Sequence, residues 1–127
     1  MEYGYKRRVT GAFDDVVSKV RAELKKEGFG VITEIDVKKT VKEKLGTDFD
    51  NYIILGACNP PFAHKALLAE RDIGLFMPCN VIVYEGGGAV FVSAIRPTLA
   101  MSMTGNPALK PLADEVETRL QRAVASI

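Results

Sequence analysis

A chain of 127 residues can bury one hydrophobic core without a disulfide or a structural metal. Its 47% hydrophobic and 26% charged residues are typical of a globular protein and exclude a disordered or fibrous one. Seventeen basic residues against sixteen acidic ones leave a net charge of +1, which is too little to hold a nucleic acid by neutralising its phosphates. We therefore predict a single domain over residues 1–127 with no nucleic-acid partner.

The start of the chain predicts a strand followed by a helix. Residues 3–10 alternate loosely, and their basic triplet at positions 6–8 suits a charged sheet edge better than a nucleic-acid contact. From Phe13 to Leu24, apolar residues recur three or four positions apart, which indicates an amphipathic helix. Gly28 ends that helix.

A second strand and a short helix follow. Residues 29–35 place β-branched side chains at alternate positions, and Asp36 then provides a capping side chain for a helix that Gly46 ends. The spacing of Val37, Val41 and Leu45 predicts that this helix turns its apolar side toward the core.

The middle of the chain predicts a buried strand and another helix. Residues 52–58 are an apolar run too short for most helices and rich in isoleucine, as in a central strand. Asn59 and the two prolines after it are a helix-start signal, because proline fits a first helical turn but disfavours helical geometry in the residue before it. The predicted helix spans about residues 61–70. Its inward face is formed by Phe62, Ala63, Ala66 and Leu67.

The last part of the chain predicts a hairpin and a long helix. Residues 81–84 and 89–95 are strands, and the glycines at 86–88 permit the positive backbone angles that a tight turn needs. Residues 99–105 are predicted to form a loop that contains Met101 and Met103. The Asn-Pro pair at 106–107 begins the last helix, whose apolar stripe extends to Val124.

This order of elements predicts an α+β fold. We expect a mostly antiparallel five-stranded sheet with the first and last helices packed on one face. Parallel βαβ winding is the competing topology, but the two middle helices are short for crossovers that cover a sheet, and the last two strands form a hairpin.

The strongest chemical signal is the similar surroundings of the two cysteines. Cys58 precedes Asn59 and a proline, and Cys79 lies between Pro78 and Asn80. If the two strands that carry them are antiparallel neighbours, both thiols lie at the same end of the sheet, whereas parallel strands would separate them. Each cysteine can be a functional thiol or a small buried hydrophobe.

Polar residues near the cysteines extend the candidate site. Asn59 and Asn80 can hydrogen-bond a polar ligand or cap backbone groups where strands stop. Cys58, Cys79 and the only histidine, His64, are a conceivable ligand set for zinc or copper, although no spacing resembles an established metal motif. We predict a ligand-binding site at Cys58, Asn59, His64, Cys79 and Asn80, with no metal ligand assigned and the cofactor unknown.

Apolar runs are too short for a signal peptide or a membrane span, so we expect a cytoplasmic protein with reduced thiols and no membrane partner. Neither a Ser/His/Asp series nor a paired-carboxylate motif nor a phosphate loop is recognisable. Homodimers are the commonest soluble oligomers, and we expect one that associates through an exposed sheet edge or helix face.

Two segments have a recognisable pattern, Gly56-Ala57-Cys58-Asn59-Pro60 before the third helix and Pro78-Cys79-Asn80-Val81 at the start of the fourth strand. With them, nearly the whole chain resembles the bacterial and archaeal family called domain of unknown function 302. The resemblance implies a curved antiparallel sheet backed by helices, similar to one half of the TATA-binding protein, and it implies that the two cysteine segments lie near one another. It implies no agreed activity, and similarity of fold does not transfer DNA binding.

Three functions are open at this point. The first is binding of a small ligand or a soft metal at the sheet end that the cysteine segments border. The second is thiol-dependent redox chemistry, which requires the Cα atoms of Cys58 and Cys79 to lie within about 7 Å of each other. The third is a structural or interaction module that acts as a homodimer.

Overall fold

The computed structural model describes residues 2–127, which contain one five-stranded sheet. Its strands are β1 (Gly4–Val9), β2 (Gly30–Asp36), β3 (Tyr52–Cys58), β4 (Cys79–Gly86) and β5 (Ala89–Ile95). They lie in the order β1-β5-β4-β3-β2, and every neighbouring pair is antiparallel. The predicted α+β fold with an antiparallel sheet is confirmed, and β1 lies at one edge.

The described part also contains five α-helices and two short 3₁₀ helices. The α-helices are α1 (Phe13–Lys26), α2 (Val37–Leu45), α3 (Pro60–Ala69), α4 (Pro97–Ser102) and α5 (Lys110–Ala125), and the 3₁₀ helices are η1 (Arg71–Phe76) and η2 (Pro107–Leu109). Of these, α4, η2 and α5 follow the last strand. None of the helices between residues 2 and 127 combines the length and the apolar composition needed to cross a bilayer.

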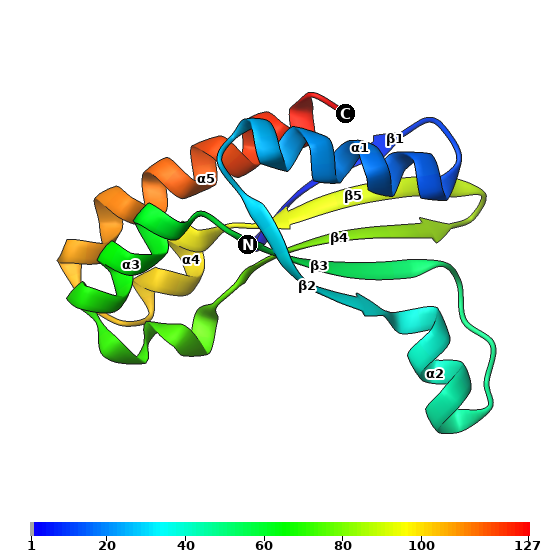
Figure 1. Cartoon of the computed structure of the whole chain (residues 1–127), viewed down its shortest axis with the longest axis horizontal. Helices are drawn as coiled ribbons and strands as arrows, with labels where there is room; N and C mark the ends of the chain where they lie inside the picture. Colours follow the sequence, from blue (N-terminus) through cyan, green and yellow to red (C-terminus); the bar gives the residue numbers. More distant parts are fainter. Residues whose placement is uncertain (1) are drawn as a thin grey trace.

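The main hydrophobic core lies between the sheet and the pair formed by α1 and α5, which lie side by side over it (Figure 1). Leu24 of α1, Leu55 of β3 and Leu120 of α5 are 1%, 0% and 0% exposed. Complete burial of a leucine side chain contributes about 1.5–3 kcal/mol relative to leaving it in water. Both helices therefore pack on one face of the sheet, as their apolar spacing predicts.

Arg7 ties the edge strand β1 to the end of α5. Its Nη1 donates hydrogen bonds to the backbone carbonyls of Val124, Ala125 and Ile127, at 3.3, 2.6 and 2.8 Å. The last carbonyls of a helix have no partner within it, and the negative end of the helix dipole attracts a cation. One guanidinium therefore links residues at opposite ends of the chain.

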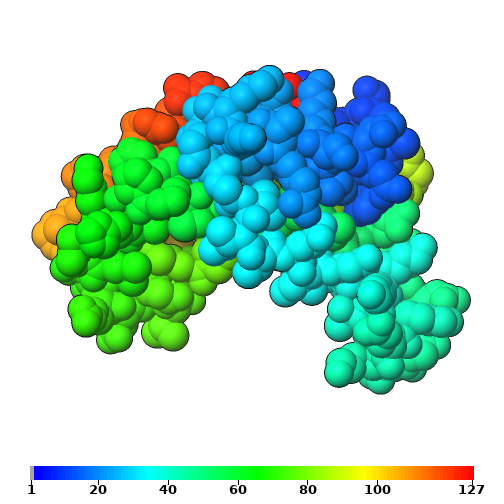
Figure 2. Space-filling view, in the orientation of Figure 1, coloured from blue at the N-terminus to red at the C-terminus, as the bar shows by residue number. Residues whose placement is uncertain are grey.

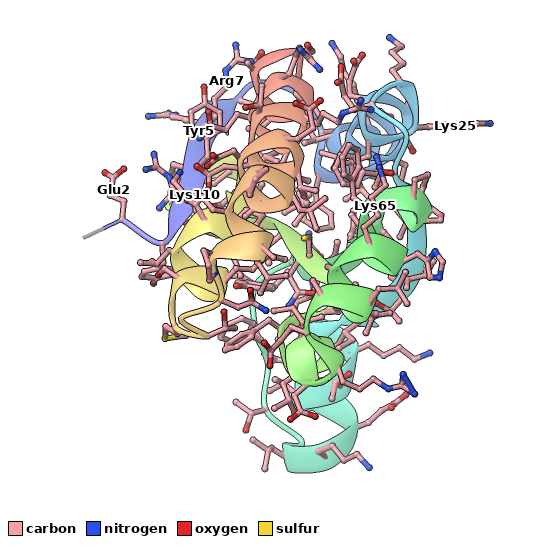
Figure 3. The ribbon with its side chains drawn as sticks, turned by 90° about the vertical axis from the view of Figure 1, so that its left-hand side faces the viewer. Glu2, Tyr5, Arg7, Lys25, Lys65 and Lys110 are labelled. Carbon is pink, nitrogen blue, oxygen red and sulfur yellow. The ribbon has the colours of Figure 1, made fainter. Side chains whose placement is uncertain are left out.

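α2 does not bury its apolar side, and the prediction that Val37, Val41 and Leu45 point into the core is wrong. None of its residues is buried, and Leu45 is 74% exposed. Asp36 caps its start as expected, by accepting a hydrogen bond from the amide of Lys39 at 3.0 Å. In the views of Figures 1 and 3, α2 lies below the sheet, away from α1 and α5. Periodicity predicts that a helix has an apolar side but not which surface covers that side.

Two short helices lie where the sequence predicts none. Part of the segment predicted as a loop belongs to α4, which Pro97 opens and which buries Met101 to 8% exposure while Met103 stays 69% exposed. η1 follows α3 directly. Helices of about six residues are too short for an apolar periodicity to be read from the sequence. Both pack at the end of the sheet where the cysteines lie, beside a second, smaller hydrophobic cluster.

Candidate functional site

The register of the sheet brings the two cysteine segments together. Ala57 of β3 lies opposite Cys79 of β4, so Cys58 is the next residue along from the partner of Cys79. On its other side, Cys58 lies opposite Gly30 of β2. Because β3 and β4 are antiparallel neighbours, both thiols lie at the same end of the sheet, as the antiparallel topology predicts.

Both thiols line a cavity at this end of the sheet, with a volume of about 260 Å³. The ends of β2, β3 and β4 form one side, and α3, α4 and α5 form the other. Figure 3 looks at this end of the molecule, and its labels on Lys65 of α3 and Lys110 of α5 help to locate the helices. Leu67 and Ile32 lie at the rim, because they line the cavity yet remain 38% and 63% exposed.

The inward face predicted for α3 is the face that lines the cavity. Phe62, Ala63, Ala66 and Leu67 all contribute to its wall. The ring of Phe62 is covered on its other side by Arg119 of α5, whose guanidinium carbon lies 5.2 Å from the ring centroid. A cation at this distance from an aromatic face is attracted to it and holds the ring in place. The cavity therefore has a wall of small and aromatic apolar side chains.

Cys79 is partly buried and packs against the main hydrophobic core. Burial, with a smaller contribution from the neighbouring Cys58 sulfur, raises the pKa of Cys79 from its ordinary value to about 11. Removing a thiolate from water is unfavourable, so the neutral form is favoured. At neutral pH the cavity therefore presents Cys79 as an uncharged thiol, which is compatible with an apolar ligand beside it.

Asn59 is the buried polar residue of the cavity, with 7% exposure. Its Nδ2 donates to the backbone carbonyl of Glu27 at 3.4 Å, and Arg119 donates to the same carbonyl at 3.2 Å. Glu27 is the C-cap of α1, so the side chain of Asn59 satisfies a backbone group where another element stops. It makes no side-chain cap to its own helix, α3.

The other two residues of the predicted site lie elsewhere. His64 is exposed on α3 and does not line the cavity, and Asn80 is exposed on β4, where it lies opposite Gly56. Asn80 follows Cys79 on β4, and because successive residues of a strand point to opposite faces, its side chain points away from the face that carries Cys79. Between residues 2 and 127, no three His, Cys, Asp or Glu side chains form a group that could hold a metal ion. Of the five residues of the predicted site, the structure therefore brings together Cys58, Asn59 and Cys79.

Sequence reasoning missed most of the apolar lining. Met77 and Met101 both line the cavity, although the sequence placed Met101 in a loop and gave no role to Met77. Leu112 and Val116 of α5 also contribute, and their place in the apolar stripe of that helix was the signal that could have assigned them. Met77 carries no such signal, because it lies between η1 and β4, outside any periodic segment.

Comparisons with known proteins place this fold in a family. The family model described as Domain of unknown function DUF302 matches residues 5–127. The chain belongs to this family. The DUF302 chain is also similar to a solved structure, described as the crystal structure of an uncharacterized conserved protein DUF302 from Bacillus stearothermophilus. The two share 32% sequence identity and a TM-score of 0.92 over 98% of each chain. A search of the curated proteins found no match.

Membership in DUF302 is the assignment that the resemblance predicted, and the adjacent cysteine segments agree with it. The likeness of this DUF302 chain to half of the TATA-binding protein stays a prediction. So does thiol-dependent redox chemistry. With a pKa of about 11, Cys79 is a thiolate in only about one molecule in a thousand at pH 8, which makes it a poor attacking nucleophile. In a redox reaction, Cys58 would have to be the attacking sulfur.

Proposed function

We propose that the protein binds a small, mainly apolar molecule in the cavity between the cysteine segments and α3. The observation that carries this proposal is a mainly apolar cavity of about 260 Å³, whose lining includes Cys58, Cys79 and few other polar residues. An engineered apolar cavity of about 150 Å³ stays free of water and binds benzene, so a cavity of this size and lining suits a somewhat larger apolar guest.

The polar groups of the cavity restrict the class of ligand. Cys79 is neutral at physiological pH, and the side-chain amide of Asn59 is already hydrogen-bonded to the carbonyl of Glu27. A charged ligand would lose its hydration without gaining a countercharge from the lining, which is strongly unfavourable. An uncharged molecule that leaves its polar group in solvent at the rim, beside Leu67 and Ile32, avoids this penalty.

Binding of 1-aminonaphthalene, an uncharged fluorophore that emits more strongly in apolar surroundings, tests this proposal. We expect saturable binding of one molecule per chain to the wild type. Ala63→Phe places a ring in the cavity and is expected to weaken binding by about tenfold or more, which corresponds to about 1.4 kcal/mol. Ala69→Phe makes the same change on the same helix at an exposed position outside the cavity, and it should leave the affinity unchanged.

The Ala63→Phe and Ala69→Phe variants also define the result that contradicts the proposal. Circular dichroism is used to establish that both are folded. Equal affinities for the fluorophore would show that it binds elsewhere, for example on an exposed apolar surface. Absence of saturable binding to the wild type would remove the support for an apolar ligand.

A soft metal ion is the second candidate, because four of the residues that line the cavity carry sulfur. They are Cys58, Cys79, Met77 and Met101. Thiolates and thioethers together favour soft ions such as copper(I). Silver(I), which is equally soft and does not change oxidation state, is expected to bind once per chain in native mass spectrometry. Binding must displace the proton of Cys79, so it should tighten as the pH rises toward 11.

Methionine variants separate this metal site from surface binding. Met101→Leu is expected to weaken silver binding, whereas Met103→Leu should not, since Met103 is 69% exposed and lies outside the cavity. Unchanged silver stoichiometry after both cysteines are replaced by serine would eliminate the metal candidate. It would leave the apolar-ligand proposal untouched.

A further inference from the structure

A second hollow lies at the β1 edge of the sheet, on the face turned away from α1 and α5. Its volume is about 420 Å³, and we call it the β1 hollow. Val81 and Val83 of β4 are buried in the main core. By the alternation of a strand, Ile82 and Tyr84 point to the opposite face, where they line the β1 hollow.

The β1 hollow and the cysteine cavity lie on different sides of the molecule. α1, β2 and α3, in blue, cyan and green, occupy the side shown in Figure 2. In Figure 3, Glu2 and Tyr5, which line the β1 hollow, lie on the opposite side from Lys65 of α3, the helix that lines the cavity. No residue of the described chain lines both. A ligand in the β1 hollow therefore leaves the cysteine cavity free.

Two cationic side chains reach the β1 hollow from different elements. Lys6 belongs to β1, and Arg96 is the N-cap residue of α4, directly after β5. Within the described lining, Glu2 is the one acidic residue. Its side chain is 82% exposed, and its carboxylate lies 3.7 Å from Nη2 of Arg96, which is longer than a hydrogen bond. So exposed an ion pair is weak, and the lining keeps an excess of positive charge.

The guanidinium of Arg96 has an unused hydrogen-bond donor. Its Nε is buried and has no partner among the described residues. Most buried polar side-chain atoms are hydrogen-bonded, and an unsatisfied one calls for an explanation such as a bound ion. A carboxylate that lies side-on to a guanidinium accepts hydrogen bonds from Nε and from one Nη together. An anion in the β1 hollow would therefore supply the partner that Nε lacks.

The remaining lining suits a ligand that also carries a ring. Gly4 leaves space, because a Cβ built on it would lie only 2.8 Å from Oγ of Ser93, which lines the hollow. Tyr3 and Tyr84 contribute aromatic rings, and Tyr3 is 77% exposed. Nζ of Lys6 lies 5.3 Å from the ring centroid of Tyr84, and this cation–π contact holds the ammonium at the hollow.

From these observations we infer that the β1 hollow binds a small aromatic carboxylate. Lys6 and Arg96 neutralise the carboxylate, Ser93 donates a hydrogen bond to it, and the rings of Tyr3 and Tyr84 pack against the aromatic body. The volume of the hollow is within the range of ordinary small-molecule sites. This site does not depend on the function proposed for the cysteine cavity.

Calorimetric titration of the full chain with 1-naphthoate tests this inference. We expect one molecule to bind per chain, more weakly as salt is added, and 1-naphthamide, which has the same ring without the charge, to bind at least about tenfold more weakly. Lys6→Met and Arg96→Gln should each weaken naphthoate binding by about tenfold or more. Arg8→Met is the matched control, because it removes the same charge from the same face of β1 outside the hollow; it should change the affinity by less than about twofold.

Amide chemical shifts of the wild type give a second measurement that needs no variant. Naphthoate should shift the amides of Gly4, Lys6 and Ser93 and leave that of Cys79 in place. Absence of saturable binding to the wild type overturns the inference. Equal weakening by Lys6→Met and Arg8→Met, both folded by circular dichroism, also overturns it, because it shows general attraction to a basic edge. So do shifts confined to the cysteine segments. Binding of 1-aminonaphthalene should be the same in Lys6→Met as in the wild type, which keeps the two sites distinguishable.

Discussion

Replacing Gly56 by alanine is expected to destabilise the protein by about 3 kcal/mol, because an added methyl group has no space between β2 and β4. A Cβ at this position would overlap the hydroxyl of Thr33 and would lie 2.6 Å from Cγ of Pro78. Thr33 can change its rotamer, but the ring of Pro78 cannot move without displacing β4. Urea unfolding monitored by circular dichroism measures the change.

Gly30 offers a control for Gly56 in the same sheet. No atom lies within 4 Å of a Cβ built on Gly30, so Gly30→Ala is expected to change the free energy of unfolding by no more than about 0.5 kcal/mol. Combining Gly56→Ala with Thr33→Ala removes one of the two clashes and should recover part of the lost stability. If the two glycine variants were equally stable, the close contact of three strands beside the cysteines would be refuted.

Raising the pH from 9 to 11 is expected to remove about 2 kcal/mol of stability through Cys79 alone. The thiol has a pKa of about 11 in the folded protein and an ordinary pKa of 9.0. Between these values the unfolded chain loses the proton while the folded chain keeps it, so the unfolded state is favoured as the pH rises. The contribution is fully present below pH 9 and is lost as the pH approaches 11.

Comparison with Cys79→Ala isolates this effect from other groups that titrate in the same range. Urea unfolding of both proteins in reductant gives a stability difference at each pH, and lysines and tyrosines contribute equally to both. We expect the advantage of the wild type over Cys79→Ala to shrink by about 2 kcal/mol across this range. Parallel curves for the two proteins would mean that Cys79 is not buried as a neutral thiol.

Much of the fold could be predicted from the sequence, because α1, α5 and the strands carry periodic apolar patterns over enough residues. Packing of α1 and α5 on one face followed from those patterns and from the order of elements. The position of α2 could not be predicted in the same way. Its spacing is that of a helix packed on a core, yet none of its residues is buried.

The candidate site was predictable only in part, since it depends on strand register and on strand faces. The similar contexts of Cys58 and Cys79 pointed to the correct end of the sheet once β3 and β4 proved antiparallel. The same contexts suggested Asn80, which is exposed and which the alternation of β4 turns away from the face that carries Cys79. His64 was close to Cys58 in sequence, but its position on α3 leaves it in solvent. The apolar lining from α4 and α5 required the tertiary structure.

The pairing of β1 with β5 has a consequence for synthesis on the ribosome. β1 contains residues 4–9, but its only hydrogen-bonded neighbour in the described sheet ends at Ile95, and Arg7 meets the carbonyls near Val124 later still. At about 5–20 residues per second, this strand waits several seconds without a partner while the rest emerges. We expect its consecutive cationic side chains to oppose aggregation during that interval. Neutralising Lys6 and Arg8, which leaves the hydrogen bonds of Arg7 in place, should therefore increase aggregation of the nascent protein more than it alters the finished fold.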